Sequence, residues 1–87
     1  MRRRVVVHGL VQGVFFRDTV RRQAQSRGVA GWVRNNPDGT VEAVFEGEPE
    51  AVERLVALAH EGPRGAIVER VDVTDEADEG LSGFSVR

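Results

Sequence analysis

The sequence contains no cysteine and no lysine, and its two histidines, His8 and His60, lie far apart along the chain. Without cysteine the chain can form no disulfide, carries no thiol nucleophile and offers no thiolate ligand to a metal. Two isolated histidines do not replace those ligands. We therefore predict no metal centre, and we expect no cofactor.

The sequence also lacks long hydrophobic runs and an excess of basic residues. No stretch approaches the ~20 apolar residues of a membrane span, and the three valines after Met1-Arg2-Arg3-Arg4 are too few for a signal-peptide core. The net charge of −2 argues against nucleic-acid binding, which needs a basic surface. With 87 residues, 40% hydrophobic and 30% charged, we expect one cytoplasmic, monomeric domain over residues 1–87, with no membrane partner.

Five strands and two helices are predicted from apolar spacing and from the positions of glycine and proline. A run of valines predicts a first strand over Arg3–His8, which Gly9 should break. Apolar residues at intervals of four predict a helix from about Phe16 to Arg27. The remaining predicted elements are strands at Val29–Asn35 and Thr40–Glu46, a helix from Pro49 to the residue before Gly62, a strand at Ile67–Thr74 and a short strand at Phe84–Val86.

The second half of the chain contains one strong turn signal and two less regular patterns. Asn36-Pro37-Asp38-Gly39 predicts a hairpin between the second and third strands. Alternation in the third strand predicts one buried face and one largely wet face. In the fourth strand Glu69 is an unexplained exception to the alternation. The acidic residues between 75 and 80 are expected to form a solvated loop rather than a metal site.

The order β-α-β-β-α-β, with one added short strand, predicts an α+β fold. We expect a ferredoxin-like sandwich in which two helices cover one face of an antiparallel sheet. In this topology the first and second strands run in the same direction. The loop after the first strand and the hairpin after the second therefore lie at the same end of the sheet. Parity places Asn35 on the same face as Val33, which we assign to the helix side.

The stretch Gly9-Leu10-Val11-Gln12-Gly13-Val14-Phe15-Phe16-Arg17 has the features of an anion-binding loop. Its N–H groups from about Val14 to Arg17 would be the unpaired donors of a helix N-terminus, which attract anions. Arg17 would lie in the first helical turn, where a cation opposes the helix dipole unless both share an anion. A planar guanidinium beside amide donors suits phosphate. No Gly-Lys-Ser or Gly-Lys-Thr follows, which argues against a nucleotide triphosphatase.

Asn35 is the candidate for holding a water molecule near that loop. A neutral side-chain amide can accept a hydrogen bond from water and so place a nucleophile beside an anion without adding repulsion. Asparagine before a turn also commonly satisfies local backbone groups, and the residues alone leave that alternative open. Asn36 competes for the role but has the opposite parity.

Other polar and aromatic residues are assigned structural roles. Gln12 is expected to face water, and Phe15 and Phe16 to seat the loop on the core. Trp32, the one tryptophan, is expected to pack. His8 ends the first strand close to the loop and could be a general base, but nothing adjacent is placed to orient it.

The chain resembles the acylphosphatase family in two separate motifs. They are Gly9–Arg17 and Gly28-Val29-Ala30-Gly31-Trp32-Val33-Arg34-Asn35 with Asp38-Gly39-Thr40-Val41-Glu42. The likeness spans essentially the whole chain, including its Phe84-Ser85-Val86-Arg87 ending. It implies a ferredoxin-like enzyme that hydrolyses the carboxyl–phosphate bond of small acyl phosphates without a metal or covalent intermediate. Arg17 and the loop amides would bind the phosphoryl group, and Asn35 would position the attacking water.

The resemblance implies a substrate-binding loop made of the backbone amides of Gln12, Gly13, Val14, Phe15, Phe16 and Arg17, together with the Arg17 side chain. Inorganic phosphate, as product, or sulfate, as a mimic, would bind there. Spacing alone does not distinguish an acyl phosphate from another small phosphate. Acylphosphatase-like domains also occur inside larger maturation proteins, so a non-catalytic module that binds phosphate or carbamoyl phosphate is the alternative. An RNA-binding sandwich is set aside because the third strand has one aromatic residue between acidic neighbours.

Overall fold

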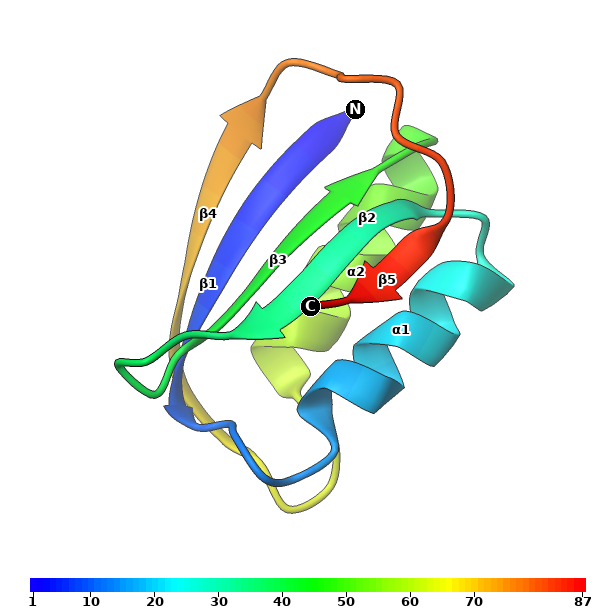
Figure 1. Cartoon of the computed structure of the whole chain (residues 1–87). Coiled ribbons are helices and arrows are strands. Elements are labelled where there is room, and N and C mark those ends of the chain that lie inside the picture. Colours follow the sequence, from blue (N-terminus) through cyan, green and yellow to red (C-terminus); the bar gives the residue numbers. More distant parts are fainter.

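Seven regular elements make up the computed structural model, which describes all 87 residues (Figure 1). They are β1 (Arg2–Leu10), α1 (Phe16–Ser26), β2 (Ala30–Asn35), β3 (Val41–Glu46), α2 (Pro49–Glu61), β4 (Ile67–Glu76) and β5 (Phe84–Val86). This order confirms the predicted ferredoxin-like α+β fold with its short extra strand. None of the helices is long and apolar enough to cross a membrane.

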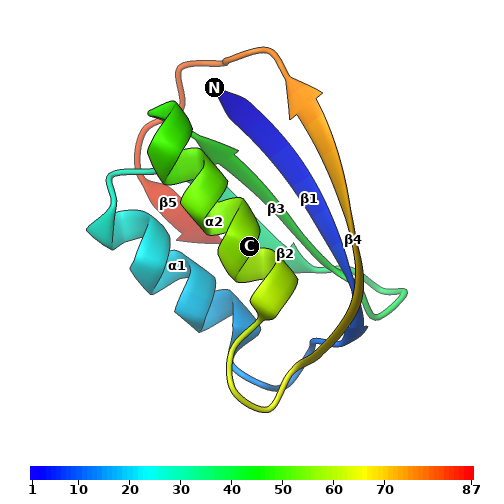
Figure 2. The same ribbon diagram turned by 180° about the vertical axis from the view of Figure 1, so that it is seen from behind.

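The five strands form one sheet in the order β4-β1-β3-β2-β5. The pairs β4–β1, β1–β3 and β3–β2 are antiparallel, whereas β2 and β5 are parallel. The sheet is therefore mixed, and not wholly antiparallel as was predicted. Both helices lie on the same face of the sheet, as Figure 2 shows from the helix side. The loop after β1 and the hairpin after β2 lie at one end of the sheet, as the topology predicted (Figure 1).

The core lies between the helices and the sheet, and it follows from two periodicities. Alternate residues of the central strands point toward the helices, and residues three and four apart on each helix point back. The fully buried large side chains are Val5, Val7, Val11, Val20, Val33, Val41, Val44, Phe45, Val52 and Leu55. All but Val44 belong to a single cluster, which anchors both ends of the β1–α1 loop.

The first strand is longer than predicted because Gly9 lies inside it rather than ending it. The register with β4 shifts between His8 and Gly9, which marks a β-bulge. Gly9 has φ +131°, and a Cβ there would lie 2.1 Å from the carbonyl oxygen of Ile67. Only glycine allows this approach of the two strands.

The same bulge explains the irregular pattern of β4. Val68 and Val71, three residues apart, both pack against the core, whereas Ile67 is 58% exposed. The register shift changes which parity faces the helices, so Glu69 is not an exception within a regular strand.

The face of β3 that points away from the helices is drier than predicted. Val44 is 0% and Glu46 7% exposed, so the expectation of a largely wet face was wrong. Val44 pairs with Trp32 of β2, which is itself buried. Guanidinium groups at 4.8–5.4 Å from the ring centre cover this indole, and they belong to Arg4, Arg34 and Arg87. The prediction that Trp32 packs is confirmed.

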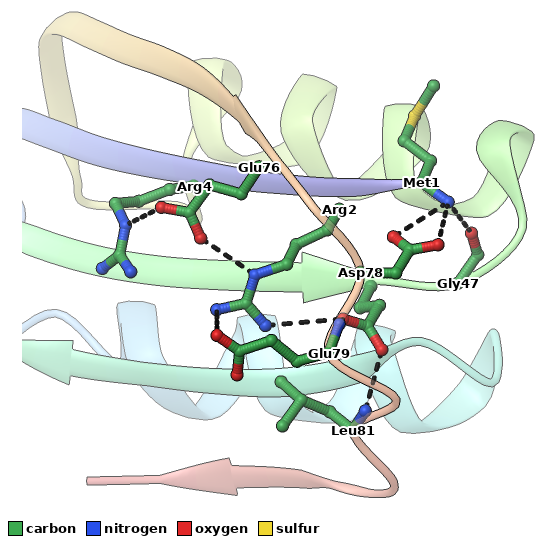
Figure 3. A network of polar contacts seen from close by, with 9 residues as sticks. Met1, Arg2, Arg4, Gly47, Glu76, Asp78, Glu79 and Leu81 are labelled. Atoms are coloured by element: carbon green, nitrogen blue, oxygen red, sulfur yellow. Dashed lines mark hydrogen bonds and ion pairs between the residues drawn. The ribbon is translucent and has the colours of Figure 1, made fainter.

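At the opposite end of the sheet from the β1–α1 loop, Arg2 is surrounded by carboxylates (Figure 3). Its guanidinium lies 2.9 Å from Glu76, 3.4 Å from Glu46 and 3.6 Å from Glu79. Glu46 also accepts hydrogen bonds of 2.8 Å from the backbone N–H groups of Glu79 and Leu81. These backbone donors, with Arg2, lower the pKa of Glu46, although its burial opposes the shift.

The acidic stretch from residue 75 onward is therefore not a simple solvated loop. Asp75 and Glu76 belong to β4, and hydrogen bonds from Arg4 and then Arg2 lower the pKa of Glu76. Asp78 pairs with the N-terminal amino group at 3.4 Å (Figure 3). These carboxylates are held by cations of the chain, and no group of three or more His, Asp or Glu side chains is arranged to hold a metal ion.

Candidate active site

The loop between β1 and α1 turns through two left-handed residues. Gly13 has φ +75°, and Phe15, which caps α1, has φ 60° and ψ 25°. Left-handed residues that alternate with right-handed ones turn successive N–H groups toward a common concave side. The loop thus turns sharply at two positions, one of which is not a glycine.

The backbone N–H groups of this loop are free to bind a ligand. Those from Gln12 to Asp18 donate no hydrogen bond to a backbone carbonyl, and Thr19, which donates to the Phe15 carbonyl at 3.0 Å, is the first that does. No side chain caps the helix. Unpaired N–H groups are therefore found at and just before the positive end of the helix dipole.

Arg17 adds a cation that the protein leaves without a partner. Five arginines make no ion pair with a carboxylate, and among them Arg17 alone is half-buried, whereas Arg27 and the other three are exposed. The neighbouring carboxylate of Asp18 is directed to Arg21 at 2.6 Å and to Arg22 at 3.1 Å. The hydrogen bond from Arg21 lowers the pKa of Asp18. The positive charge of Arg17 thus remains uncompensated at a helix N-terminus.

Asn35 ends β2 and presents its side chain on the helix side, as predicted from its parity with the fully buried Val33. Its Oδ1 atom is buried and has no hydrogen-bond donor within the chain. An unsatisfied buried acceptor costs about 1–3 kcal/mol, so this group does not stabilise the fold. The Asn35 side chain makes no hydrogen bond to local backbone groups, so the alternative that it satisfies them is wrong.

Asn36, the competing residue, has a structural role on the hairpin. Its Nδ2 group donates to Thr40 Oγ1 at 3.0 Å and to Glu42 Oε1 at 3.1 Å, and its Oδ1 accepts from Arg34 at 3.0 Å. These contacts occupy both ends of its amide. Asn35 is therefore the asparagine that remains for a ligand or a water molecule.

The loop and Asn35 line one cavity of about 370 Å³. Its wall is formed by Val11, Gly13, Phe15, Phe16, Arg17, Asp18, Asn35 and Val86. The segments that the strand order predicted to meet do meet here. Val11 and Val86 were not singled out from the sequence, because nothing in their spacing connects them with the loop; Val86 arrives through the parallel pairing of β5 with β2.

Gln12 is exposed, as expected, but its side chain also makes hydrogen bonds within the protein. Its Nε2 group donates to the carbonyl oxygens of Asn36 at 2.8 Å and Thr40 at 3.0 Å. A single side chain thus ties the anion-binding loop to the hairpin that carries Asn35. This bond spans 24 residues of sequence, which is why no local pattern indicated it.

The two phenylalanines of the loop have opposite environments. Phe16 is 3% exposed and belongs to the core, as predicted. Phe15 is 82% exposed, so the expectation that it seats the loop on the core was wrong. A left-handed backbone costs a residue other than glycine roughly 1–3 kcal/mol. The loop therefore places an exposed aromatic ring on strained backbone.

His8 lies outside this cavity, on the sheet face that the helices leave open. Its Nε2 atom is 2.9 Å from Asp72 Oδ2 and 3.2 Å from an Arg70 guanidinium nitrogen. His60 Nδ1 lies 3.0 Å from the Val56 carbonyl oxygen in α2. The structure brings neither histidine into reach of Arg17 or Asn35.

The chain is similar to known proteins over almost its whole length. A family model described as Acylphosphatase matches residues 3–86. An acylphosphatase of Rubrobacter xylanophilus is 61% identical over 85 residues, which cover 97% of this chain and 77% of the relative. The crystal structure of acylphosphatase from Bacillus subtilis matches with a TM-score of 0.93 and 38% identity, over 99% of this chain and 97% of that one. Full-length HypF in its phosphate- and nucleotide-bound form matches with a TM-score of 0.90 and 28% identity, over 99% of this chain but 11% of HypF.

Proposed function

Because this chain belongs to the acylphosphatase family, we propose that Arg17 and the backbone amides from Gln12 to Arg17 bind the phosphoryl group of its substrate and that Asn35 positions the attacking water. Enzymes of this family act on small acyl phosphates, and this chain is such an enzyme. The proposal concerns which of its residues perform the reaction and how.

Electrostatics supports the assignment of the binding residues. A phosphoryl group carries its negative charge on three oxygens and needs several donors around it. The free N–H groups of the loop, the helix dipole and the Arg17 guanidinium all converge on the same cavity. Donors fixed in advance stabilise the charge of the transition state without reorganisation. They supply the positive potential that a metal ion would otherwise supply.

The reaction needs little else from the protein because the leaving group is good. The water oxygen forms a bond to phosphorus while the bond from phosphorus to the carboxyl oxygen breaks, and the carboxylate departs with the electron pair. A proton of the water passes to a phosphoryl oxygen. The Asn35 amide orients the water by hydrogen bonding. Rotation of the amide by 180° about the Cβ–Cγ bond determines whether its Oδ1 or its Nδ2 faces the cavity. No strong acid is required.

The observation that carries this proposal is the pairing of two unsatisfied groups in one cavity. A half-buried cation without a carboxylate and a buried amide oxygen without a donor each cost folding free energy. A phosphorylated substrate and its attacking water satisfy both. Inorganic phosphate, the product, and sulfate are expected to bind the same groups.

Substitution of Asn35 tests the assignment. In Asn35→Ala we expect kcat to fall about 10²-fold with the dissociation constant of inorganic phosphate unchanged, because water loses its orientation while the anion keeps its donors. Asn36→Ala is the matched control; it should lower unfolding stability by about 1 kcal/mol and leave kcat within about threefold. An Asn35→Ala enzyme that hydrolyses acetyl phosphate at the parent rate contradicts the water-positioning role.

Similarity to a segment of HypF, a much longer protein, favours a second candidate function. A domain of this fold could bind phosphate or carbamoyl phosphate without turning it over. Hydrolysis of acetyl phosphate in the presence of a chelator distinguishes the two, since only the catalytic function produces acetate. We further propose that the protein acts in the cytoplasm as a monomer without nucleic acid, and gel filtration with and without added RNA tests the last two points.

A further inference from the structure

Phe15 is an apolar residue of the cavity that the core of the fold does not need. Its ring is 82% exposed, so it contributes little to the core, and its backbone is left-handed at φ 60°. Glycine or asparagine would adopt this conformation more readily. Stability thus explains neither the aromatic ring nor its position, and an exposed apolar residue on strained backbone indicates a binding role.

The cavity is also larger and less polar than a phosphate site requires. Its volume of about 370 Å³ lies in the range of sites that hold whole small molecules. Polar donors lie on one part of its wall, at Arg17 and the loop amides. Much of the rest of the wall is apolar: Val11 and Phe16 are buried, whereas Phe15 and Val86 are exposed. A phosphoryl group held by the donors leaves its acyl group beside these apolar side chains.

We infer that Phe15 determines specificity by contacting the acyl group, and that the chain prefers acyl phosphates with an aromatic or extended apolar acyl group over those with a short one. The inference rests on the proposed phosphoryl-binding role of Arg17 and the loop amides. An aromatic acyl group packs against the exposed ring in an offset or edge-to-face arrangement and removes apolar surface of both from water. Apolar contacts of this kind discriminate between substrates by roughly 10- to 200-fold.

The test compares benzoyl phosphate with acetyl phosphate in the parent and in Phe15→Asn. Asparagine tolerates the left-handed backbone, so this variant removes the ring while keeping the loop conformation. We expect kcat/KM for benzoyl phosphate to fall about 10-fold. The fall in kcat/KM for acetyl phosphate, which has no group to reach the ring, should be smaller, so the ratio of kcat/KM for benzoyl phosphate to that for acetyl phosphate should fall.

Two further variants separate the ring from the loop. Phe15→Tyr keeps the ring and should keep the preference for benzoyl phosphate. Leu10→Ala removes another exposed apolar side chain, 67% exposed, that does not line the cavity, and should change neither substrate's kcat/KM. Each substrate is compared only with itself across variants, because the two differ in intrinsic reactivity.

Binding of phosphonate analogues, with a methylene in place of the bridging oxygen, provides a readout that does not depend on turnover. Calorimetry should show that Phe15→Asn weakens the benzoyl analogue about 10-fold and leaves the acetyl analogue unchanged. An equal loss for both substrates and both analogues, or no loss for either, overturns the specificity role. A parent protein that hydrolyses neither substrate yet loses only the benzoyl analogue in Phe15→Asn would refute the catalytic proposal and retain the contact with Phe15.

Discussion

Arg2 and Arg17 are the same side chain at opposite ends of the sheet, in opposite chemical situations. Arg2 is 5% exposed and lies within ion-pair distance of Glu46, Glu76 and Glu79 (Figure 3). Arg17 is half-buried beside unpaired N–H groups and has no carboxylate partner. One end of the sheet pairs its cation with the chain's own acids, and the other leaves its cation without an acidic partner from the chain.

The difference shows how one residue type serves two purposes. A buried ion pair adds little to stability compared with apolar packing, but removing one partner leaves the other charge unpaired and is costly. An unpaired cation costs stability at all times and repays that cost only when a ligand binds. The two ends of the sheet therefore differ in whether the cation has acidic partners: Arg2 has three, and Arg17 has none.

Replacing Arg17 should have the largest effect, and on activity alone. In Arg17→Met we expect kcat/KM for acetyl phosphate to fall about 10³-fold, because the transferred phosphoryl loses its charged donor. The free energy of unfolding should stay equal or rise by up to about 1 kcal/mol, since a cation at a helix N-terminus is unfavourable. Arg27→Met, at the C-cap of the same helix and with the same change of charge, should retain parent activity. Steady-state kinetics and urea denaturation check the prediction; loss of stability without loss of activity would reverse the comparison.

Replacing Arg2 should show the converse. Arg2→Met leaves Glu46 without its cation and Glu76 with Arg4 alone, and we expect a loss of about 3 kcal/mol in unfolding free energy, measured by urea denaturation. At temperatures where the variant is folded, kcat/KM should stay within about twofold of the parent. If the variant is as stable as the parent, the ion-pair network does not contribute to the free energy of unfolding. The proposed contrast between Arg2 and Arg17 is then wrong.

Replacing Gln12 tests whether the reactive end must be held rigid. In Gln12→Met we expect kcat to fall about 10-fold, because the loop and Asn35 are no longer tied together. Stability should change by less than about 1 kcal/mol, because the two carbonyls keep partners: Asn36 accepts from Gly39 at 3.1 Å and Thr40 accepts from Asn36 at 2.8 Å. A fall in stability with unchanged kcat would give Gln12 a purely structural role.

The smallest expected effect is the loss of stability at low pH, and it should arise at the Arg2 end of the sheet. The pKa values of Glu46 and Glu76 are lowered from their ordinary value of 4.5, so their contribution to stability is present above that pH and lost as pH falls below it. The midpoint of urea unfolding should therefore drop between about pH 6 and pH 3. Glu76→Gln should flatten this dependence, whereas Glu69→Gln, an unpaired exposed residue of the same strand, should not. Identical acid profiles for the parent and Glu76→Gln would contradict the assignment.

Local chemistry made much of this structure predictable from the sequence. The turn at Asn36-Pro37-Asp38-Gly39 and the apolar periodicities gave the element order, and the order alone placed the anion-binding loop beside the hairpin. Parity then placed Asn35 on the helix side. These inferences succeed because turn chemistry and side-chain alternation depend on neighbours in sequence.

The remainder depended on residues that are distant in sequence. Nothing near Arg2 indicates acids that lie 44 and 74 residues away, and nothing near Gln12 indicates the carbonyls that it binds. Phe15 was placed in the core because large apolar residues usually lie there, whereas the left-handed loop turns it outward. The β-bulge between His8 and Gly9 changes which side chains of β4 face the helices. The apolar pattern of the strand does not reveal such a bulge.

The strand order β4-β1-β3-β2-β5 also governs how the molecule assembles. The central strands β1, β3 and β2 lie within the first 46 residues, and the two edge strands are added from later in the chain. Strands far apart in sequence lose loop-closure entropy before their contacts form. We therefore expect folding in milliseconds to seconds rather than in microseconds. Val86 reaches the cavity only when β5 docks beside β2. A nascent chain whose central strands have already paired therefore still lacks one wall of the cavity that contains Arg17 and Asn35.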